Sequence, residues 1–225
     1  MSAIPNLLLA ALPRKSYAEL LPSLTPVVLK FGDVLYEPGQ SIEQVYFPGD
    51  SMVSLLTLVE GHLALEVGLV GPEGVVGSPL ALGVDRSPVR ALVQGGGSAM
   101  RISAGSFRSA LRRSAPLQRG LLRYVDFLMS QITQTAACNR FHVVERRLAR
   151  WLLMTRDRVR SDEFRMTQDF LSNMLGVRRV GVTEAAGALQ RRKLIKYSRG
   201  AISILNGRGL EAAACSCYGT LRNAA

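Results

Sequence analysis

The sequence predicts an α+β fold in which a strand-rich N-terminal region precedes a helical C-terminal region. Short apolar stretches alternate with turn-forming residues up to about Ser103, and after Pro116 apolar residues recur every three or four positions. Charge follows the same division. Residues 1–138 carry 11 Lys/Arg and 10 Asp/Glu, whereas residues 139–225 carry 17 and 7. A nearly neutral region is therefore joined to a basic one, which is suited to meet a polyanion.

The first helix is expected near the N-terminus. Residues 7–12 are apolar, and we interpret them as part of an amphipathic helix running towards Leu24. The patch is too short to cross a bilayer, and no basic segment precedes it as in a secretory signal. Because the sequence contains no run of 18 apolar residues, we expect no membrane span and a cytoplasmic protein.

Short strands are predicted from Val27 to about Ser103. The stretches with strand-like composition are 27–31, 34–36, 45–47, 52–58, 63–70, 89–93 and 99–103. Turn-forming pairs such as Gly32-Asp33 and Glu60-Gly61 separate them. Several short strands at this spacing favour a sandwich, a barrel or a jelly roll.

A long helix is predicted after Pro116. One set of its residues is spaced four, three, four and three positions apart: Leu121, Val125, Leu128, Ile132 and Thr135. This 3.5-residue period is typical of a seam between two helices, and we favour a homodimer seam over packing of the helix on its own domain. A second apolar line, formed by Leu122, Met129 and Ala136, is expected to face the strand region.

A further helix is expected over 143–158, followed by a helix-turn-helix over 167–191. Thr167 is suited to cap the first helix of the pair, and Gly176 can take the positive φ that a tight turn needs. The second helix is expected to start near Arg178. Its predicted inner face consists of Val182, Ala185, Ala186 and Leu189. Strands at 194–197 and 202–205 then predict a β-hairpin wing with Arg199 at its tip.

This arrangement predicts binding of duplex DNA, because the N-terminal residues of such a second helix reach base edges in the major groove. Arg179 can donate two hydrogen bonds to guanine, Glu184 can accept one from cytosine, and Val180 can touch a thymine methyl group. Thr183 is expected at a base or a phosphate. The residues expected at phosphates are Thr167, Gln168, Arg178, Arg191, Arg192 and Lys193, joined by Arg199 in the wing.

The order of β region, long helix and winged helix resembles the Crp/Fnr family of bacterial transcription regulators over almost the entire chain. The strongest match to the family's DNA-binding motif is MTQDFLSNMLGVRRVGVTEAAGALQRRKLI. The resemblance implies that Arg179 and Glu184 read bases, and that Val180, where many members carry glutamate, changes the sequence preference. It also implies a sensor domain at 1–115, a dimerisation helix at 116–141 and a DNA-binding domain at 142–225, with RNA polymerase as a further partner.

The N-terminal region resembles the cyclic-nucleotide-binding fold of the same family. By that resemblance, Gly77 and Ser78 align with the first part of the phosphate-binding cassette, and Arg86 and Ser87 with the second. Arg86 can form a bidentate pair with a phosphate and Ser87 can donate a further hydrogen bond, although both also suit a surface turn. Because Ser78 replaces the glutamate that holds the ribose and the loop is shortened, we expect an effector other than classical cyclic AMP.

Three classes of function are weighed. A homodimeric transcription regulator leads, a nucleotide-binding regulatory module that acts without DNA is the alternative, and no catalytic constellation supports an enzyme. Three cysteines and two histidines show no metal-ligand spacing, so neither zinc nor haem nor an iron–sulfur cluster is expected. These residues are Cys138, Cys215, Cys217, His62 and His142. For Cys215 and Cys217, on an expected terminal helix, packing is favoured over a redox role.

Overall fold

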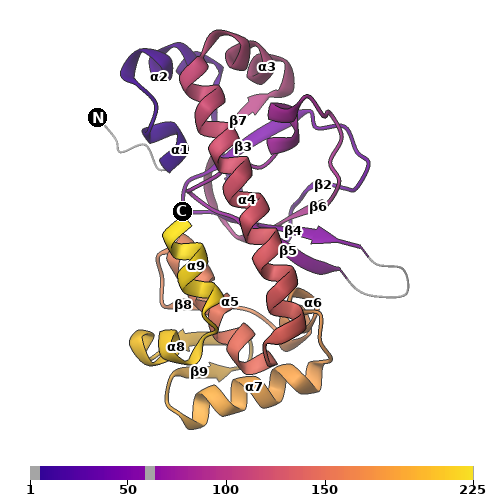
Figure 1. The fold of residues 1–225 in the computed structure, drawn as a ribbon, viewed down its shortest axis with the longest axis vertical. Helices are drawn as coiled ribbons and strands as arrows, with labels where there is room; N and C mark the ends of the chain where they lie inside the picture. Colours follow the sequence, from indigo (N-terminus) through magenta and orange to yellow (C-terminus); the bar gives the residue numbers. More distant parts are fainter. Residues whose placement is uncertain (1–5, 59–63, 225) are drawn as a thin grey trace. The chain divides into compact units, whose positions relative to one another are not determined.

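The computed structural model describes residues 6–58 and 64–224 (Figure 1). The predicted turn at Glu60-Gly61 and His62 lie outside the described residues. The chain forms two compact units. The N-terminal unit comprises Met1–Thr57 and Gly68–Met129, and the C-terminal unit comprises Leu58–Val67 and Ser130–Ala225.

Two short helices, α1 (Leu7–Ala10) and α2 (Arg14–Leu20), open the N-terminal unit, and a 3-10 turn, η1 (Leu21–Ser23), follows them. The prediction of one helix running towards Leu24 is wrong. Pro13 stands in an extended conformation between the helices, with φ −53° and ψ 143°. It has no N–H to continue the hydrogen bonds of α1, and it disfavours helical backbone in the residue before it.

Two antiparallel sheets form the predicted β jelly roll. The first has the order β1 (Thr25–Leu29), β7 (Gly97–Ser103), β3 (Gln44–Pro48). The second has the order β2 (Val34–Tyr36), β6 (Arg90–Gly95), β4 (Met52–Thr57), β5 (Leu65–Val70). The strands lie close to the predicted positions because each apolar stretch ends at a residue that favours a turn. The 3-10 turn η2 (Ser78–Leu82) lies between β5 and β6.

The core of the N-terminal unit is built from alternate residues of both sheets. Val45, Phe47 and Ile102 of the first sheet and Val93 of the second are almost completely buried. The helix α3 (Ala104–Arg113) covers this core, and the ring centroid of its Phe107 lies 6.2 Å from that of Phe47. In β3, for example, the period of two gives one buried face, with Val45 and Phe47, and one more exposed face.

The long helix α4 (Ala115–Phe141) confirms the helix predicted after Pro116. Leu121 and Leu128, which we placed on a seam between subunits, are buried within the single chain. Leu122 and Met129 are exposed to 45% and 58% instead, and Ala136 on the same line is exposed as well. The prediction that this second line faces the strand region is therefore wrong. Both lines satisfy the same period, so spacing alone could not tell which of them the chain buries.

The C-terminal unit is centred on α5 (Val144–Val159), whose Leu148, Trp151 and Leu152 are buried. Around it lie α6 (Gln168–Leu175), α7 (Arg179–Arg191), α8 (Gly207–Ala213) and α9 (Cys217–Ala224). A third sheet has the order β8 (Glu163–Arg165), β10 (Ala201–Ile204), β9 (Ile195–Ser198). The helix predicted at 143–158 is confirmed to within one residue at each end.

No helix among residues 6–58 and 64–224 is both long and apolar enough to cross a membrane.

Candidate nucleic-acid interface

The first helix of the predicted pair, α6, begins as the sequence indicates. Thr167 is its N-cap, and the Thr167 hydroxyl accepts a hydrogen bond from the Phe170 N–H at 3.2 Å. Asp169 lies in the first turn, where a negative charge favours the helix dipole. Ser172 is buried, and its hydroxyl donates to the Asp169 carbonyl at 2.7 Å. A small residue here lets α6 pack against α7, which it contacts.

The turn between α6 and α7 depends on Gly176. This residue has φ 60° and ψ 43°, the left-handed conformation that glycine adopts without a steric penalty. Its N–H donates to the Asn173 carbonyl, and the Val177 N–H donates to the Ser172 carbonyl at 2.9 Å. These bonds satisfy carbonyls that the end of α6 would otherwise leave unpaired. The sequence-based prediction of a glycine turn is confirmed.

The second helix, α7, has one buried face and one exposed face. All four residues predicted for its inner face are buried: Val182, Ala185, Ala186 and Leu189. The residues predicted to meet DNA from its first turns are all exposed: Arg178, Arg179, Val180, Thr183 and Glu184. Val180 is 60% exposed. The structure therefore presents both charged and apolar groups on one accessible surface.

Polar side chains link the N-terminal ends of the two helices. The Thr183 hydroxyl lies 2.9 Å from Gln168 Oε1 and 3.1 Å from the Arg179 carbonyl oxygen, so it can donate to either. Arg179 Nε lies 3.5 Å from Asp169 Oδ1, and both side chains are about two-thirds exposed, at 66% and 71%. An ion pair this exposed contributes little to stability and can exchange for another partner.

The wing is a tight hairpin of β9 and β10. Its two turn residues, Arg199 and Gly200, have φ of 49° and 79°, as a two-residue turn with positive φ at both central positions requires. Arg199 is exposed at the tip. Tyr197 in β9 donates from its hydroxyl to the Met166 carbonyl at 2.8 Å, which ties the wing to the segment that precedes α6. Burial raises the pKa of this tyrosine, so it remains protonated.

Further basic groups lie at the end of α7. Arg191 and Lys193 are exposed, and Lys193 has a positive φ of 56° where the helix ends. Arg192 pairs with Glu145, at 2.8 Å between Nη1 and Oε1. Arg147 and Arg150 of α5 are buried. The basic excess of this region is therefore not confined to its surface.

The residues predicted to bind an effector lie around η2 in the N-terminal unit. Gly77 has φ 104°, and Ser78 is buried at the start of η2. Arg86 is exposed and donates from Nη1 to the Gly39 carbonyl at 2.7 Å. Ser87 is buried, and its hydroxyl donates to the Val89 carbonyl at 2.7 Å. The Ser87 hydroxyl proton is thus already used in a hydrogen bond within the chain.

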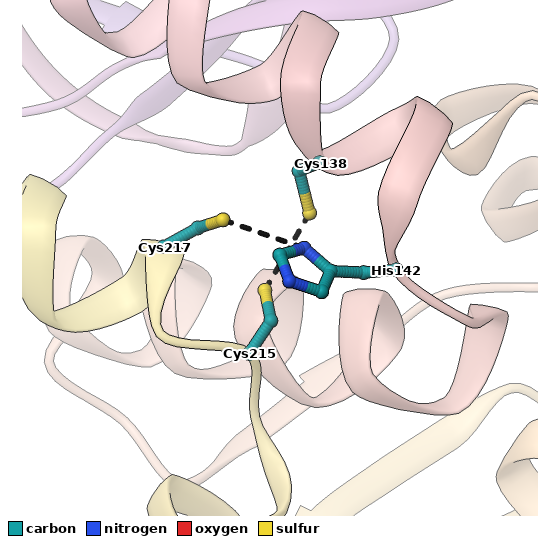
Figure 2. A group of neighbouring side chains, drawn as sticks. All are labelled: Cys138, His142, Cys215 and Cys217. Carbon is teal, nitrogen blue, oxygen red and sulfur yellow. Dashed lines mark hydrogen bonds between the residues drawn. The ribbon is translucent and has the colours of Figure 1, made fainter.

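The structure also gathers side chains that the sequence-based analysis did not connect. Three thiols and one imidazole in the C-terminal unit have their Sγ and Nδ1 or Nε2 atoms within 4.8 Å of one another (Figure 2). We call this group the Cys3His cluster; it consists of Cys138, His142, Cys215 and Cys217. The expectation that these residues have no metal-ligand arrangement is wrong as a statement of geometry. The signal available in the sequence was a Cys-x3-His at the end of one helix and a Cys-x-Cys 73 residues after the histidine.

The cluster is held at short distances and in a positive environment. Cys138 Sγ lies 3.5 Å from Cys215 Sγ, and Cys217 Sγ lies 3.5 Å from His142 Nδ1. A hydrogen bond from the Cys215 thiol, opposed by burial and helped by the charge of Arg150, lowers the pKa of Cys138 to about 5. The same bond, together with burial, raises the pKa of Cys215. The Cys138 thiol therefore loses its proton more readily than the Cys215 thiol.

Taken together, α6, the Gly176 turn, α7 and the hairpin define the C-terminal unit as a winged helix-turn-helix module. Residues 146–213 match the model of a Crp-like helix-turn-helix domain. The resemblance to the Crp/Fnr family that the sequence indicates is thereby confirmed for the region that carries the motif.

Solved structures extend this likeness over most of the chain. A protein described as a Crp/Fnr-family transcriptional regulator from Eubacterium rectale superposes with a TM-score of 0.72 at 16% identity, covering 94% of this chain and 99% of its own. A Crp/Fnr-family regulator from Thermus thermophilus gives 0.70 at 22% identity, covering 84% and 98%. FixK2 from Bradyrhizobium japonicum gives 0.69 at 15% identity, covering 85% and 98%. Among curated protein sequences none matches this chain. The chain has the fold of Crp/Fnr-type transcription regulators.

Proposed function

We propose that this protein is a homodimeric, sequence-specific transcription regulator of the Crp/Fnr type. The observation that carries the proposal is the surface of α7. Its first turns expose Arg179, Val180 and Glu184, while its opposite face is buried in a winged helix-turn-helix. A helix presented in this way fits the major groove, where its N-terminal residues meet base edges.

Base reading is assigned to residues of different chemistry. Arg179 donates two hydrogen bonds to guanine O6 and N7 once its exposed contact with Asp169 exchanges for the base. Glu184 accepts from cytosine N4, and Val180 packs on a thymine methyl group. Thr183 shares a polar contact with Gln168, so a base or phosphate contact by one helix positions the other.

Phosphate contacts are assigned to the groups that surround α7. Thr167 and Gln168 lie at the N-terminal end of α6, where backbone N–H groups favour an anion. The exposed cations that we assign to phosphates are Arg178, Arg191, Lys193 and, in the wing, Arg199. These contacts fix the register of the protein on DNA without reading sequence.

A second copy of the chain is the proposed partner along α4. Leu122 and Met129 are large apolar residues seven positions apart, and both are exposed in the single chain. Pairing of this line with its symmetry copy removes the apolar surface from water. A two-fold dimer then requires a roughly palindromic operator with half-sites about 34–36 Å apart.

Control by a signal in the N-terminal unit completes the proposal, with residues 1–115 as sensor, 116–141 as dimerisation helix and 142–225 as DNA-binding domain. Arg86 and the turn at Gly77 and Ser78 are the proposed effector site. The buried, internally bonded Ser87 favours a ligand other than a classical cyclic nucleotide. The effector acts by binding one arrangement of the dimer more tightly than the other. RNA polymerase is a proposed further partner.

The test is selection of DNA sequences by the purified full-length protein, followed by gel-shift titration of variants on the selected operator. Arg179→Ala is expected to weaken specific binding by about 5–150-fold and to relax one base position. Lys193→Ala is expected to weaken all sequences alike and to lower the salt slope by about 1. Arg112→Ala removes an equal charge from an exposed position of α3 in the N-terminal unit and serves as the control.

Two results contradict the proposal. The first is binding that ignores sequence or selects sites without two-fold symmetry. The second is an Arg179→Ala variant that loses affinity equally on every sequence, which removes the base-reading role. Loss of function in Arg86→Ala with none in Arg179→Ala favours the alternative, a nucleotide-binding module that acts without DNA.

A further inference from the structure

The Cys3His cluster connects two segments that are distant in the sequence but belong to the same unit. Cys138 lies in the last turn of α4, and His142 follows directly after that helix. Cys215 and Cys217 flank the exposed Ser216 between α8 and the start of α9. In Figure 2 the four side chains point towards a common centre from these two segments. The DNA-binding surface of α7 uses none of them.

We propose that the Cys3His cluster binds one zinc ion. Three thiolates and one imidazole are a ligand set that structural zinc sites use, with four protein ligands arranged tetrahedrally. Binding breaks the S–H bonds of the thiols that are still protonated and releases those protons to solvent, while the imidazole binds in its neutral form. The inference is independent of the proposed function, because no DNA contact enters it.

The distances in the cluster suit a single ion. With Zn–S bonds of about 2.3 Å and a Zn–N bond of about 2.0–2.1 Å, a tetrahedron places two sulfurs about 3.8 Å apart and a sulfur and a nitrogen about 3.6 Å apart. The Cys138–Cys215 sulfurs are 3.5 Å apart, and the Cys217 sulfur is 3.5 Å from the His142 nitrogen. No pair of ligand atoms is separated by more than 4.8 Å, so shifts of about 1 Å complete the tetrahedron.

The surroundings of the cluster carry charge that a zinc site would balance. Three thiolates, a neutral histidine and Zn²⁺ sum to a net charge of −1. Arg147 and Arg150 are buried, and in the described part of the chain neither pairs with a carboxylate. Each also has an Nε atom without a hydrogen-bond partner among the described residues. Buried cations need a nearby negative charge, and a zinc–thiolate centre supplies one.

A hydrogen bond to one sulfur also fits a thiolate. Gln134 of α4 donates from Nε2 to Cys217 Sγ at 3.0 Å. Groups that hydrogen-bond a metal ligand orient it and tune the affinity for the metal. All three cysteines are nearly inaccessible, at 0–3% exposure, as in sites whose metal is closed to solvent. Four protein ligands leave no open position, so the expected role is structural rather than catalytic.

Zinc binding would stabilise two segments of the C-terminal unit by connecting them. Zinc would link the end of α4 to the segment that leads into α9, a helix of only 8 residues. A metal that binds the folded state and not the unfolded one contributes its binding free energy to folding. We therefore expect chelation to loosen α9 and the end of α4 before it affects the jelly roll.

The experiment is metal analysis of the full-length protein, purified without an affinity metal under reducing, anaerobic conditions. Inductively coupled plasma mass spectrometry is expected to find one zinc ion per chain. After removal of zinc with a chelator, cobalt(II) is expected to give the intense visible absorption of tetrahedral cobalt with thiolate-to-metal charge transfer in the near ultraviolet. Added zinc should displace cobalt and bleach these bands.

Variants separate a ligand role from packing. Cys215→Ser and Cys217→Ser are expected to lose zinc affinity by more than the roughly 10–100-fold that follows removal of a group bonded to a ligand. Gln134→Ala is expected to fall within that range and to keep the cobalt spectrum. Ser216→Ala, a change of the exposed residue between the two cysteines, is the matched control and should bind zinc as the unaltered chain does.

Three outcomes overturn the proposal. One is the absence of stoichiometric zinc together with the absence of tetrahedral cobalt bands in the unaltered, folded chain. Another is the presence of iron and acid-labile sulfide in place of zinc, which would identify an iron–sulfur cluster. The last is a Cys138–Cys215 disulfide that persists in the reduced preparation, together with an affinity for zinc that is the same in Cys217→Ser and Ser216→Ala. Because the cobalt test uses the unaltered protein, it remains decisive if a cysteine variant fails to fold.

Discussion

The turn at Gly176 offers a quantitative test of the helix-turn-helix. In the Gly176→Ala variant an L-residue must keep φ near 60°, which costs about 1–2 kcal/mol. The added Cβ would also lie 2.6 Å from Leu65 Cδ1 in the same unit. This contact is with the end of a flexible, half-buried side chain, so we take the lower limit for overpacking, about 1 kcal/mol. The expected loss of stability is about 2–3 kcal/mol.

The assay is equilibrium unfolding in urea, followed by tryptophan fluorescence. Trp151 is the only tryptophan of the chain, and it is 1% exposed in α5, so its signal reports on the C-terminal unit. With an m-value of about 2 kcal/mol per molar, the midpoint should fall by about 1–1.5 M.

Gly181→Ala provides the matched control within the same motif. Gly181 lies in α7, and an added Cβ there meets no atom within 4 Å. Alanine is favoured over glycine in a helix interior by about 0.5–1 kcal/mol, so in the first turn of α7 this variant should be more stable by no more than that amount. An unchanged or raised midpoint for Gly176→Ala, or an equal loss in both variants, would refute the reasoning about the turn.

Two further predictions concern the N-terminal unit, and far-UV circular dichroism can follow both. Gly74→Ala should destabilise the unit by about 1–3 kcal/mol, because the added Cβ would lie 2.2 Å from the Tyr124 ring. Gly120→Ala is the control: its Cβ, in α4, meets no atom within 4 Å, so this variant should be slightly more stable. Ser98→Ala removes the side-chain hydrogen bond that most lowers the pKa of Asp50 below 3.8. A carboxyl group whose pKa is lowered by folding stabilises the folded state above about pH 4, and this stabilisation is lost as the pH falls through the lowered pKa. Because Ser98→Ala removes the main cause of the lowered pKa, the variant should lose less stability on acidification than the unaltered protein. Equal acid sensitivity in the two proteins would contradict this cause.

Features that depend on local sequence were predicted well. The cap at Thr167, the glycine turn, the buried face of α7 and the wing hairpin all follow from rules that act over a few residues. The strands of the jelly roll were also located, because turn-forming residues limit each apolar stretch. The first helix was predicted too long, because the hydrophobic pattern continues past Pro13 whereas the helix does not.

Features that depend on residues far apart could not be obtained in this way. Hydrophobic spacing on α4 gave two apolar lines, and only the packed chain shows that Leu121 is buried and Leu122 exposed. Ser87 was assigned to a ligand from its position, but its hydroxyl is bonded to the backbone of Val89. The contact between Arg179 and Asp169 likewise exists only because α6 and α7 cross.

By itself, then, the sequence determined the approximate positions of the jelly-roll strands, of α4 to α7 and of the wing, together with the exposed surface of α7, because caps, turns and periodicity are encoded within single segments. The tertiary structure decided which groups meet. Cys138 and Cys215 are 77 residues apart in the sequence, yet their sulfurs lie 3.5 Å apart once α4 and the segment before α9 pack in one unit. Spacing along the chain carries no information about such a meeting, because the intervening helices and strands set the distance in space.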